Sequence, residues 1–222
     1  CPGGPLFIVG EVMTRRVRVR IATALLLLGA VPDGLAYVVN INTGTRAIYL
    51  RVGDGTITGG NYTGGGVPSN GGAISLVQVT VPAASVGNGV DQAMTGNGRL
   101  TSDYDGYTFC TAGQIYIGGF FRQPANNPNV SATLRVTSPA TLVNASGDTI
   151  PMSQISWTSS AIGDTGTQPI PAGTFTGGTQ TLATNFQRNT WRESCHSFVY
   201  GNDAVVPAGT YNARVTYTLT SP

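Results

Sequence analysis

The sequence predicts an all-β domain, an antiparallel two-sheet sandwich that follows a signal-peptide helix. Helix-type apolar spacing is absent beyond residue 36, where Gly, Thr, Asn, Ser and Pro recur every few residues. Short runs of β-branched and aromatic residues are frequent there, and Gly- and Pro-rich turns separate them. Without helices there is no crossover connection to make a parallel sheet, so we expect antiparallel pairing.

The first part of the chain has the order of a secretory signal. Within residues 13–36, four arginines at positions 15–20 precede the apolar run Ile21 to Ala30, and small residues at Gly34 and Ala36 suit cleavage after Ala36. The apolar run is shorter than the roughly 20 residues that a membrane-spanning helix needs. A buried helix of the folded domain is the alternative interpretation. We assign residues 1–12 to an upstream extension or start artefact.

Charge is scarce in this chain. Charged residues make up 10% of it and give a net charge of +2, with arginine as the only cationic residue type; an average soluble domain is roughly 25% charged. Loss of residues 1–36 would remove four arginines and two acids, which leaves eight of each and a net charge of zero. We therefore expect one neutral β-sandwich domain over residues 37–222, with no nucleic-acid partner and no membrane contact after signal cleavage.

Two cysteines, Cys110 and Cys195, remain after the leader. An even number in an oxidising compartment predicts one disulfide. Closing a loop of some 85 residues would contribute roughly 4 to 5 kcal/mol on the chain-entropy estimate. Two free buried thiols are the alternative, because the sequence does not place the two Cα atoms within bridging distance.

The C-terminus carries the clearest strand signal. Apolar and polar residues alternate there with period two, which predicts a strand with one inward face. A turn signal at Pro207 to Gly209 precedes it, and a shorter apolar run, Phe198 to Tyr200, lies before the turn. We expect these two runs to form a hairpin or neighbouring strands of one sheet. The apolar positions of the C-terminal strand are Tyr211, Ala213, Val215, Tyr217 and Leu219.

Five further strands are predicted upstream, for at least seven in all. A shift of alternation between Leu76 and Val77 predicts a bulge. The glycine-rich segment 53–72 predicts a mobile loop or hairpin tip, and the polar segment 123–129 predicts a connection between strands. The five strands are Ala47 to Val52, Ile74 to Val81, Gln114 to Phe121, Ala132 to Thr137 and Ile155 to Thr158.

Side chains that catalyse reactions are scarce. The chain has one histidine and no lysine, and beyond the leader only one glutamate. His196 directly follows Cys195, and adjacent strand residues point to opposite faces, so a polar neighbour of a disulfide is favoured over a catalytic base. The His and Cys ligands of a zinc site are missing. We therefore expect no catalytic residue, no metal and no cofactor.

Two acidic motifs resemble known sites only in part. Asp164-Thr165-Gly166 matches the aspartic-protease triplet, but that chemistry needs two copies, so a turn is favoured. Asp103 to Gly106 is spaced like the start of a calcium loop without the remaining ligands, so a solvated turn is favoured. An extracellular hydrolase centred on Asp164 or Glu193 is the least favoured function.

Four aromatic side chains are candidates for a sugar-binding platform: Tyr104, Tyr107, Trp157 and Trp191. Core packing is the default expectation for the two tryptophans. A self-contained extracellular carbohydrate-binding module, with glycans as partners, is therefore the alternative function.

The ending Pro207 to Leu219 resembles the C-terminal strand Ala-Gly-x-Tyr-x-x-x-Val of bacterial pilus subunits, and Leu142 to Pro151 resembles a central loop and strand of them. The similarity is to the broad chaperone-usher and spore-coat-U-like group. It implies an incomplete immunoglobulin-like sandwich, completed by a strand from a neighbouring subunit, with other subunits and a periplasmic chaperone as partners. Val39 and Ile41, in Tyr37 to Asn42, offer a short apolar alternation for such a donor strand.

The resulting expectation is a secreted, non-catalytic structural or adhesive surface protein that acts through strand edges and loops. Such a protein would pass through the periplasm to the cell surface or the medium. The length of the domain leaves a tip or minor-subunit role, or a self-complete sandwich, open.

Overall fold

A computed structural model describes residues 38–54 and 74–222, which belong to one compact unit. This part of the chain is all-β. Besides its strands it holds two short 3-10 helices, η1 (Ala83–Ser85) and η2 (Met152–Gln154). All pairings between strands are antiparallel. The predicted class, an all-β fold with antiparallel sheets, is confirmed.

Three sequence predictions fall on residues outside these ranges: the upstream extension 1–12, the signal peptide 13–36 and most of the glycine-rich segment 53–72. Within the described ranges, no helix has the length and hydrophobicity that a membrane crossing requires.

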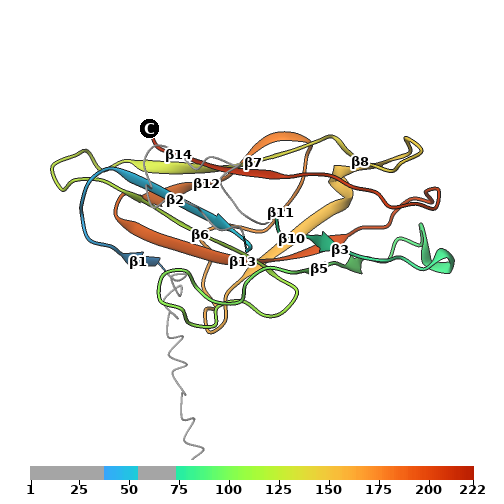
Figure 1. The fold of residues 1–222 in the computed structure, drawn as a ribbon, viewed down its shortest axis with the longest axis horizontal. Coiled ribbons are helices and arrows are strands. Elements are labelled where there is room, and N and C mark those ends of the chain that lie inside the picture. Colours follow the sequence, from blue (N-terminus) through green and yellow to red (C-terminus); the bar gives the residue numbers. More distant parts are fainter. Residues whose placement is uncertain (1–37, 55–73) are drawn as a thin grey trace, which may run out of the picture. The chain divides into compact units, whose positions relative to one another are not determined.

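The largest sheet has seven strands and is organised around β13 (Figure 1). Its path is β11-β10-β13-β6-β2, and β1 and β4 also pair with β13. The strand β13 therefore has partners along both of its edges. The seven strands are β1 (Val38–Asn40), β2 (Ala47–Val52), β4 (Gln92–Ala93), β6 (Ile115–Arg122), β10 (Ile155–Ser160), β11 (Gly173–Thr174) and β13 (Thr190–Tyr200).

The remaining strands form three smaller sheets. A three-stranded sheet has the order β12-β7-β14, and two pairs, β3 with β5 and β8 with β9, stand apart from it. The bounds are β3 (Val77–Gln78), β5 (Thr95–Gly96), β7 (Ser131–Ser138), β8 (Thr141–Val143), β9 (Thr149–Pro151), β12 (Gly178–Gln187) and β14 (Thr216–Thr220).

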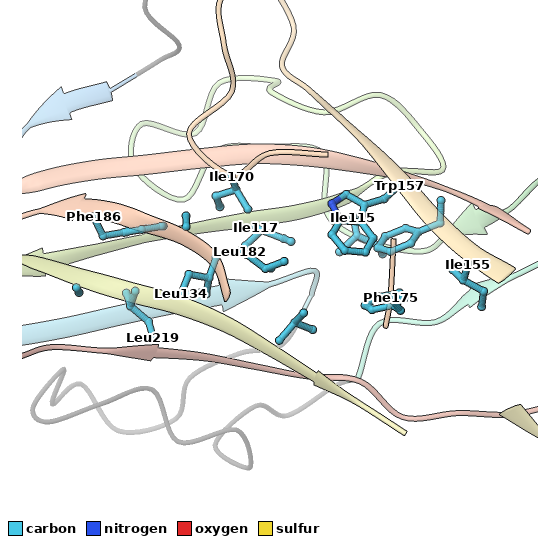
Figure 2. Close-up of a cluster of buried hydrophobic side chains, with 14 of the residues drawn as sticks. Ile115, Ile117, Leu134, Ile155, Trp157, Ile170, Phe175, Leu182, Phe186 and Leu219 are labelled. Carbon is cyan, nitrogen blue, oxygen red and sulfur yellow. The ribbon is translucent and has the colours of Figure 1, made fainter. Parts of the chain in front are cut away.

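The hydrophobic core lies between the seven-stranded and the three-stranded sheet (Figure 2). Ile117 of β6, Leu134 of β7, Phe186 of β12 and Leu219 of β14 are fully buried in it. Because side chains alternate along a strand, each of these strands turns one apolar face inward. Burial of each such side chain contributes about 1.5 to 3 kcal/mol.

Four of the predicted strands are found at or close to their predicted places. The strand β2 has the predicted bounds, and β6, β7 and β10 differ from prediction by one or two residues at an end. The polar segment 123–129 connects β6 to β7 as expected, and Arg188 Nη1 donates hydrogen bonds to its carbonyl oxygens.

The predicted strand Ile74 to Val81 is wrong in extent, because only Val77–Gln78 is a strand. Its partner β5 has two residues, and Ile74 and Leu76 are exposed rather than turned to a core. The predicted bulge therefore has no ladder to interrupt.

The C-terminal strand is shorter than predicted, and it joins a different sheet from the run Phe198 to Tyr200. Tyr217 and Leu219 lie in β14, whereas Tyr211, Ala213 and Val215 precede it. Asn212 instead exchanges two backbone hydrogen bonds with Val143. The run Phe198 to Tyr200 ends β13, whose edges are occupied by β10 and β4, so β14 pairs with β7.

Candidate functional site

A disulfide fixes the loop that precedes β6 to the centre of the large sheet. Cys110 and Cys195 are bonded, their Cα atoms are 5.5 Å apart and their sequence separation is 85. Both are fully buried, and Phe109 and Tyr116 pack around them. The loop between β5 and β6 is thereby held against one face of β13.

Neighbouring residues of β13 face opposite ways. Cys195 and Glu193 face the disulfide-linked loop, whereas Phe198 belongs to the core between the sheets. Because side chains alternate, Trp191 shares the loop face, and Ser194 and His196 share the core face.

Glu193 is completely buried on the loop face, and three neighbours donate hydrogen bonds to its carboxylate. Ser102 Oγ lies 2.9 Å from both carboxylate oxygens, Trp191 Nε1 lies 2.8 Å from Oε2, and the Tyr116 hydroxyl donates to the same oxygen. Burial raises the pKa of Glu193, and these hydrogen bonds act in the opposite direction. We call Glu193, Ser102, Trp191, Tyr116 and Asp103 the Glu193 cluster.

Tyr116 connects Glu193 to a second carboxylate. Its hydroxyl accepts a hydrogen bond from the backbone N–H of Asp103 at 3.1 Å. The Asp103 side chain in turn pairs with Arg51 Nε at 2.6 Å and with Arg99 Nη1. Burial and the charge of Glu193 raise the pKa of Asp103 to about 6. The turn expected at Asp103 to Gly106 is found, and Tyr104, Asp105 and Gly106 are exposed. The expectation of solvation is wrong for the Asp103 side chain alone, because Arg51 and Arg99 pair with it.

Gly118 makes room for this connection. It lies opposite Glu193 on one side and Arg51 on the other. A Cβ atom at Gly118 would lie 2.1 Å from the Tyr116 hydroxyl oxygen. Only glycine lets the Tyr116 side chain reach across the strand to Glu193.

The Glu193 cluster is suited to holding the loop rather than to reacting with a substrate. Glu193 and Ser102 are 0% and 2% exposed, so a substrate has no access to the carboxylate in this structure. A fully buried carboxylate with three donors costs much less to bury than a bare one, and it orients the groups that bind it.

His196 and Ser194 lie on the opposite face of β13, and both are fully buried. Ser194 Oγ accepts a hydrogen bond from Ile170 N, and His196 Nε2 lies 3.4 Å from Ile170 O. The His196 ring stacks on Trp157, and burial lowers its pKa to about 4. This histidine is neutral at pH 7, and it packs in the core rather than beside the disulfide.

The core packing expected by default for Trp157 and Trp191 is found, which removes both from the four candidates for a sugar platform. Trp157 is 3% exposed, because it packs against Phe175 in the core. Trp191 is 4% exposed, between Tyr49 and Tyr104. Neither indole face is open to a ligand. The other two candidates are exposed, Tyr104 at 44% and Tyr107 at 76%.

Tyr107 lines a pocket of about 450 Å³ between two loops, which we call the loop pocket. The green loop between β5 and β6 and the orange loop between β10 and β11 meet there (Figure 1), and Ile162 N donates a hydrogen bond to Phe109 O at 3.0 Å. The pocket is lined by Asp105, Tyr107, Thr108, Phe109, Ile162, Gly163 and Asp164.

The two carboxylates of the loop pocket are set by turns. Asp105 Oδ1 accepts a hydrogen bond from Tyr107 N at 3.0 Å, and Asp164 Oδ1 accepts one from Gly166 N at 2.8 Å. The turn predicted at Asp164 is therefore found. No group of three or more His, Cys, Asp or Glu side chains placed to hold a metal occurs within residues 38–54 and 74–222.

The sequence pointed to three members of the Glu193 cluster, Asp103, Trp191 and Glu193, each for a different reason. It did not single out the other two members, Ser102 and Tyr116, nor the neighbouring residues Arg51, Arg99 and Gly118. One available signal was the rarity of charge, because Glu193 is the only glutamate beyond residue 36 and lies in a segment that pattern marks as strand, where burial of a carboxylate needs partners.

No family model, no curated protein and no solved structure matches this chain.

Proposed function

We propose that this chain is an exported, non-catalytic surface protein with an immunoglobulin-like sandwich, and that it acts by adhesion through its loops. The disulfide supports export, because such bonds persist in oxidising compartments outside the cytosol. The leader over residues 13–36 would direct it to the bacterial periplasm on its way to the cell surface. A periplasmic chaperone and pilus subunits remain its proposed partners.

One observation carries the choice of an adhesive over a polymerising subunit: the N-terminal strands are paired inside their own domain. The strand β1 lies antiparallel to β13, with Val39 opposite Trp191, and β2 pairs with β6. A donor strand must instead project and pair with a neighbour. This pairing favours a self-complete sandwich, in a tip role or as an independent adhesin.

The test uses the protein purified from the periplasm. Light scattering should give the mass of one chain, and a synthetic peptide of residues 37–46 should neither bind to it nor raise its melting temperature. Peptide uptake, or chain-like oligomers, would instead support strand exchange and refute the self-complete version. Immunolabelling of intact cells tests the proposed location, and labelling only after lysis would contradict it.

A carbohydrate-binding module is the second candidate function, and the exposure of Tyr107 on a disulfide-anchored loop favours it. Exposed aromatic rings of this kind offer a face to sugar rings at little entropic cost. A glycan array should give hits that Tyr107→Ala abolishes. An array without hits would contradict this function.

A further inference from the structure

We propose that Arg192 binds a small oxyanion on the core face of β13, together with the hydroxyl group of Ser194. We call these two side chains the Arg192 site. The site is separate from the loop pocket and from the proposed function, neither of which uses these residues.

Arg192 is a buried cation without a counter-charge. It is 8% exposed, and its Nε atom is fully buried. Within residues 38–54 and 74–222, no hydrogen bond, ion pair or ring contact reaches its guanidinium group. An arginine keeps its charge in a protein, and a buried charge without a partner is among the most costly groups to fold. Burial lowers the pKa of Arg192, and no neighbouring carboxylate raises it.

The elements packed around Arg192 supply no anion. The residues opposite it are Gly119 on β6 and Val38 on β1. The strand β12 of the smaller sheet contacts β13 and has no charged residue. Glu193 is the next residue along the chain, but it faces the disulfide-linked loop and is occupied by three donors. An anionic ligand would supply the charge that these elements lack.

The geometry suits an oxyanion. Of the three guanidinium nitrogens only Nε is fully buried, so Nη1 and Nη2 can be reached from solvent. Ser194 stands on the same face of β13, about 7 Å further along the strand. Its Oγ accepts a hydrogen bond from Ile170 N at 3.3 Å, and its own proton is donated to no described residue.

These donors also define the class of ligand. A guanidinium group donates two parallel hydrogen bonds to one carboxylate or phosphate group, and the serine hydroxyl adds a third donor. The low exposure of Arg192 admits only a small ion or the end of a larger molecule. The ligand is therefore a carboxylate or phosphate group rather than a large polyanion.

The experiment follows the Nε–H signal of Arg192 by NMR, in the exported, disulfide-bonded protein with ¹⁵N-labelled arginine. Sodium phosphate and sodium acetate are added separately at constant ionic strength, with chloride as the balancing anion. At least one of the two oxyanions should shift this signal to saturation, and chloride should not. In the same samples, the melting temperature should rise by about 4 °C for each tenfold increase of that oxyanion above its Kd.

Variants at Arg192 test the charge and the shape of the donor. Arg192→Met should melt no lower than the unchanged protein in chloride, because it removes an uncompensated buried charge, and it should lose the response to oxyanions. Arg192→Lys keeps the charge but not the planar fork, and it should bind about tenfold more weakly. The control Arg135→Met removes an exposed arginine that is bonded to Thr220, and it should keep the full response.

Two serine variants test the second donor. Ser194 and Ser159 each make one hydrogen bond with the backbone of Ile170. Ser194→Ala and Ser159→Ala therefore lose a similar contact, but only Ser194 lies two residues from Arg192 on one strand face. Ser194→Ala should weaken oxyanion binding by about fivefold, and Ser159→Ala should leave it unchanged.

Four results would count against the Arg192 site. An equal rise of melting temperature in Arg192→Met would show a general salt effect and overturn the site. An Arg192→Met variant that melts well below the unchanged protein in chloride would show that protein groups already compensate the guanidinium, which also overturns it. Saturation of the Arg192 signal by chloride would overturn the oxyanion class. Equal affinities in Ser194→Ala and Ser159→Ala would overturn the role given to Ser194.

Discussion

Tyr116→Phe removes one oxygen atom from the Glu193 cluster and two hydrogen bonds with it. The hydroxyl donates to the Glu193 carboxylate and accepts from Asp103 N. Loss of a hydrogen bond to a charged acceptor costs about 1.5 to 3 kcal/mol, and the part-buried N–H of Asp103, left without its partner, adds about 1 kcal/mol. The free energy of unfolding should therefore fall by about 3 kcal/mol. In a domain of this size that lowers the melting temperature by about 9 °C.

Urea denaturation with the disulfide intact measures this difference, and an unchanged m-value would show that the variant stays two-state. The control is Tyr211→Phe, whose hydroxyl donates one hydrogen bond to Pro207 O in an exposed turn. That variant should lose less than about 1 kcal/mol. If Tyr116→Phe loses no more than the control, the Glu193 cluster does not hold the loop and the reasoning fails.

Three further predictions concern the same region. Because the pKa values of Asp103 and Glu193 are raised, the folded state binds these protons more tightly than the unfolded chain does. Their contribution to the free energy of unfolding is therefore fully present below about pH 4 and is lost as pH rises through about 6. Urea titrations should give a free energy of unfolding about 1 to 2 kcal/mol higher at pH 5 than at pH 8, and a higher value at pH 8 would contradict the raised pKa values. Reduction of the Cys110–Cys195 disulfide should lower the free energy of unfolding by about 2 to 5 kcal/mol, and a melting temperature unchanged by reductant would show that the bond adds no stability. Gly118→Ala should lower the free energy of unfolding by about 2 kcal/mol or more, because the new Cβ atom collides with the Tyr116 hydroxyl. The control Gly44→Ala should lower it by less than about 1 kcal/mol, because its Cβ atom meets only the flexible Arg122 side chain. Equal melting temperatures for the two variants would refute the steric argument.

The local pattern of apolar and polar residues was sufficient to locate a strand where the strand is apolar on its inward face. The bounds of β2 follow from Ala47 to Val52, and β6, β7 and β10 carry enough β-branched and aromatic residues to be recognised. The same pattern was insufficient to locate β12, because its ten residues are largely polar. Only Leu182, Ala183 and Phe186 of this strand are buried. Its pairing with β7 is interrupted by register shifts, which disturb the alternation that a sequence search relies on.

The candidate sites could be predicted only in pieces. Sequence singled out Tyr107 as a possible sugar contact and a turn at Asp164, but their meeting in the loop pocket depends on contacts between two loops far apart in the chain. The Glu193 cluster joins Ser102, Tyr116 and Glu193 from three separate segments, and Arg51 pairs with Asp103 of the cluster from a fourth. No local spacing relates them.

The sequence by itself determined the all-β class, four strands of the core and the only two cysteines that the described chain could pair, because alternation and residue type are local properties. Tertiary structure alone decided which sheet receives the C-terminal strand, since a strand joins the edge that is free and β13 had none. It also decided that Trp191 and Glu193 turn toward a loop, where aromatic packing and hydrogen bonds bury them, while Tyr107 stays exposed beside Asp164. Those choices depend on long-range pairing, which no stretch of the sequence contains.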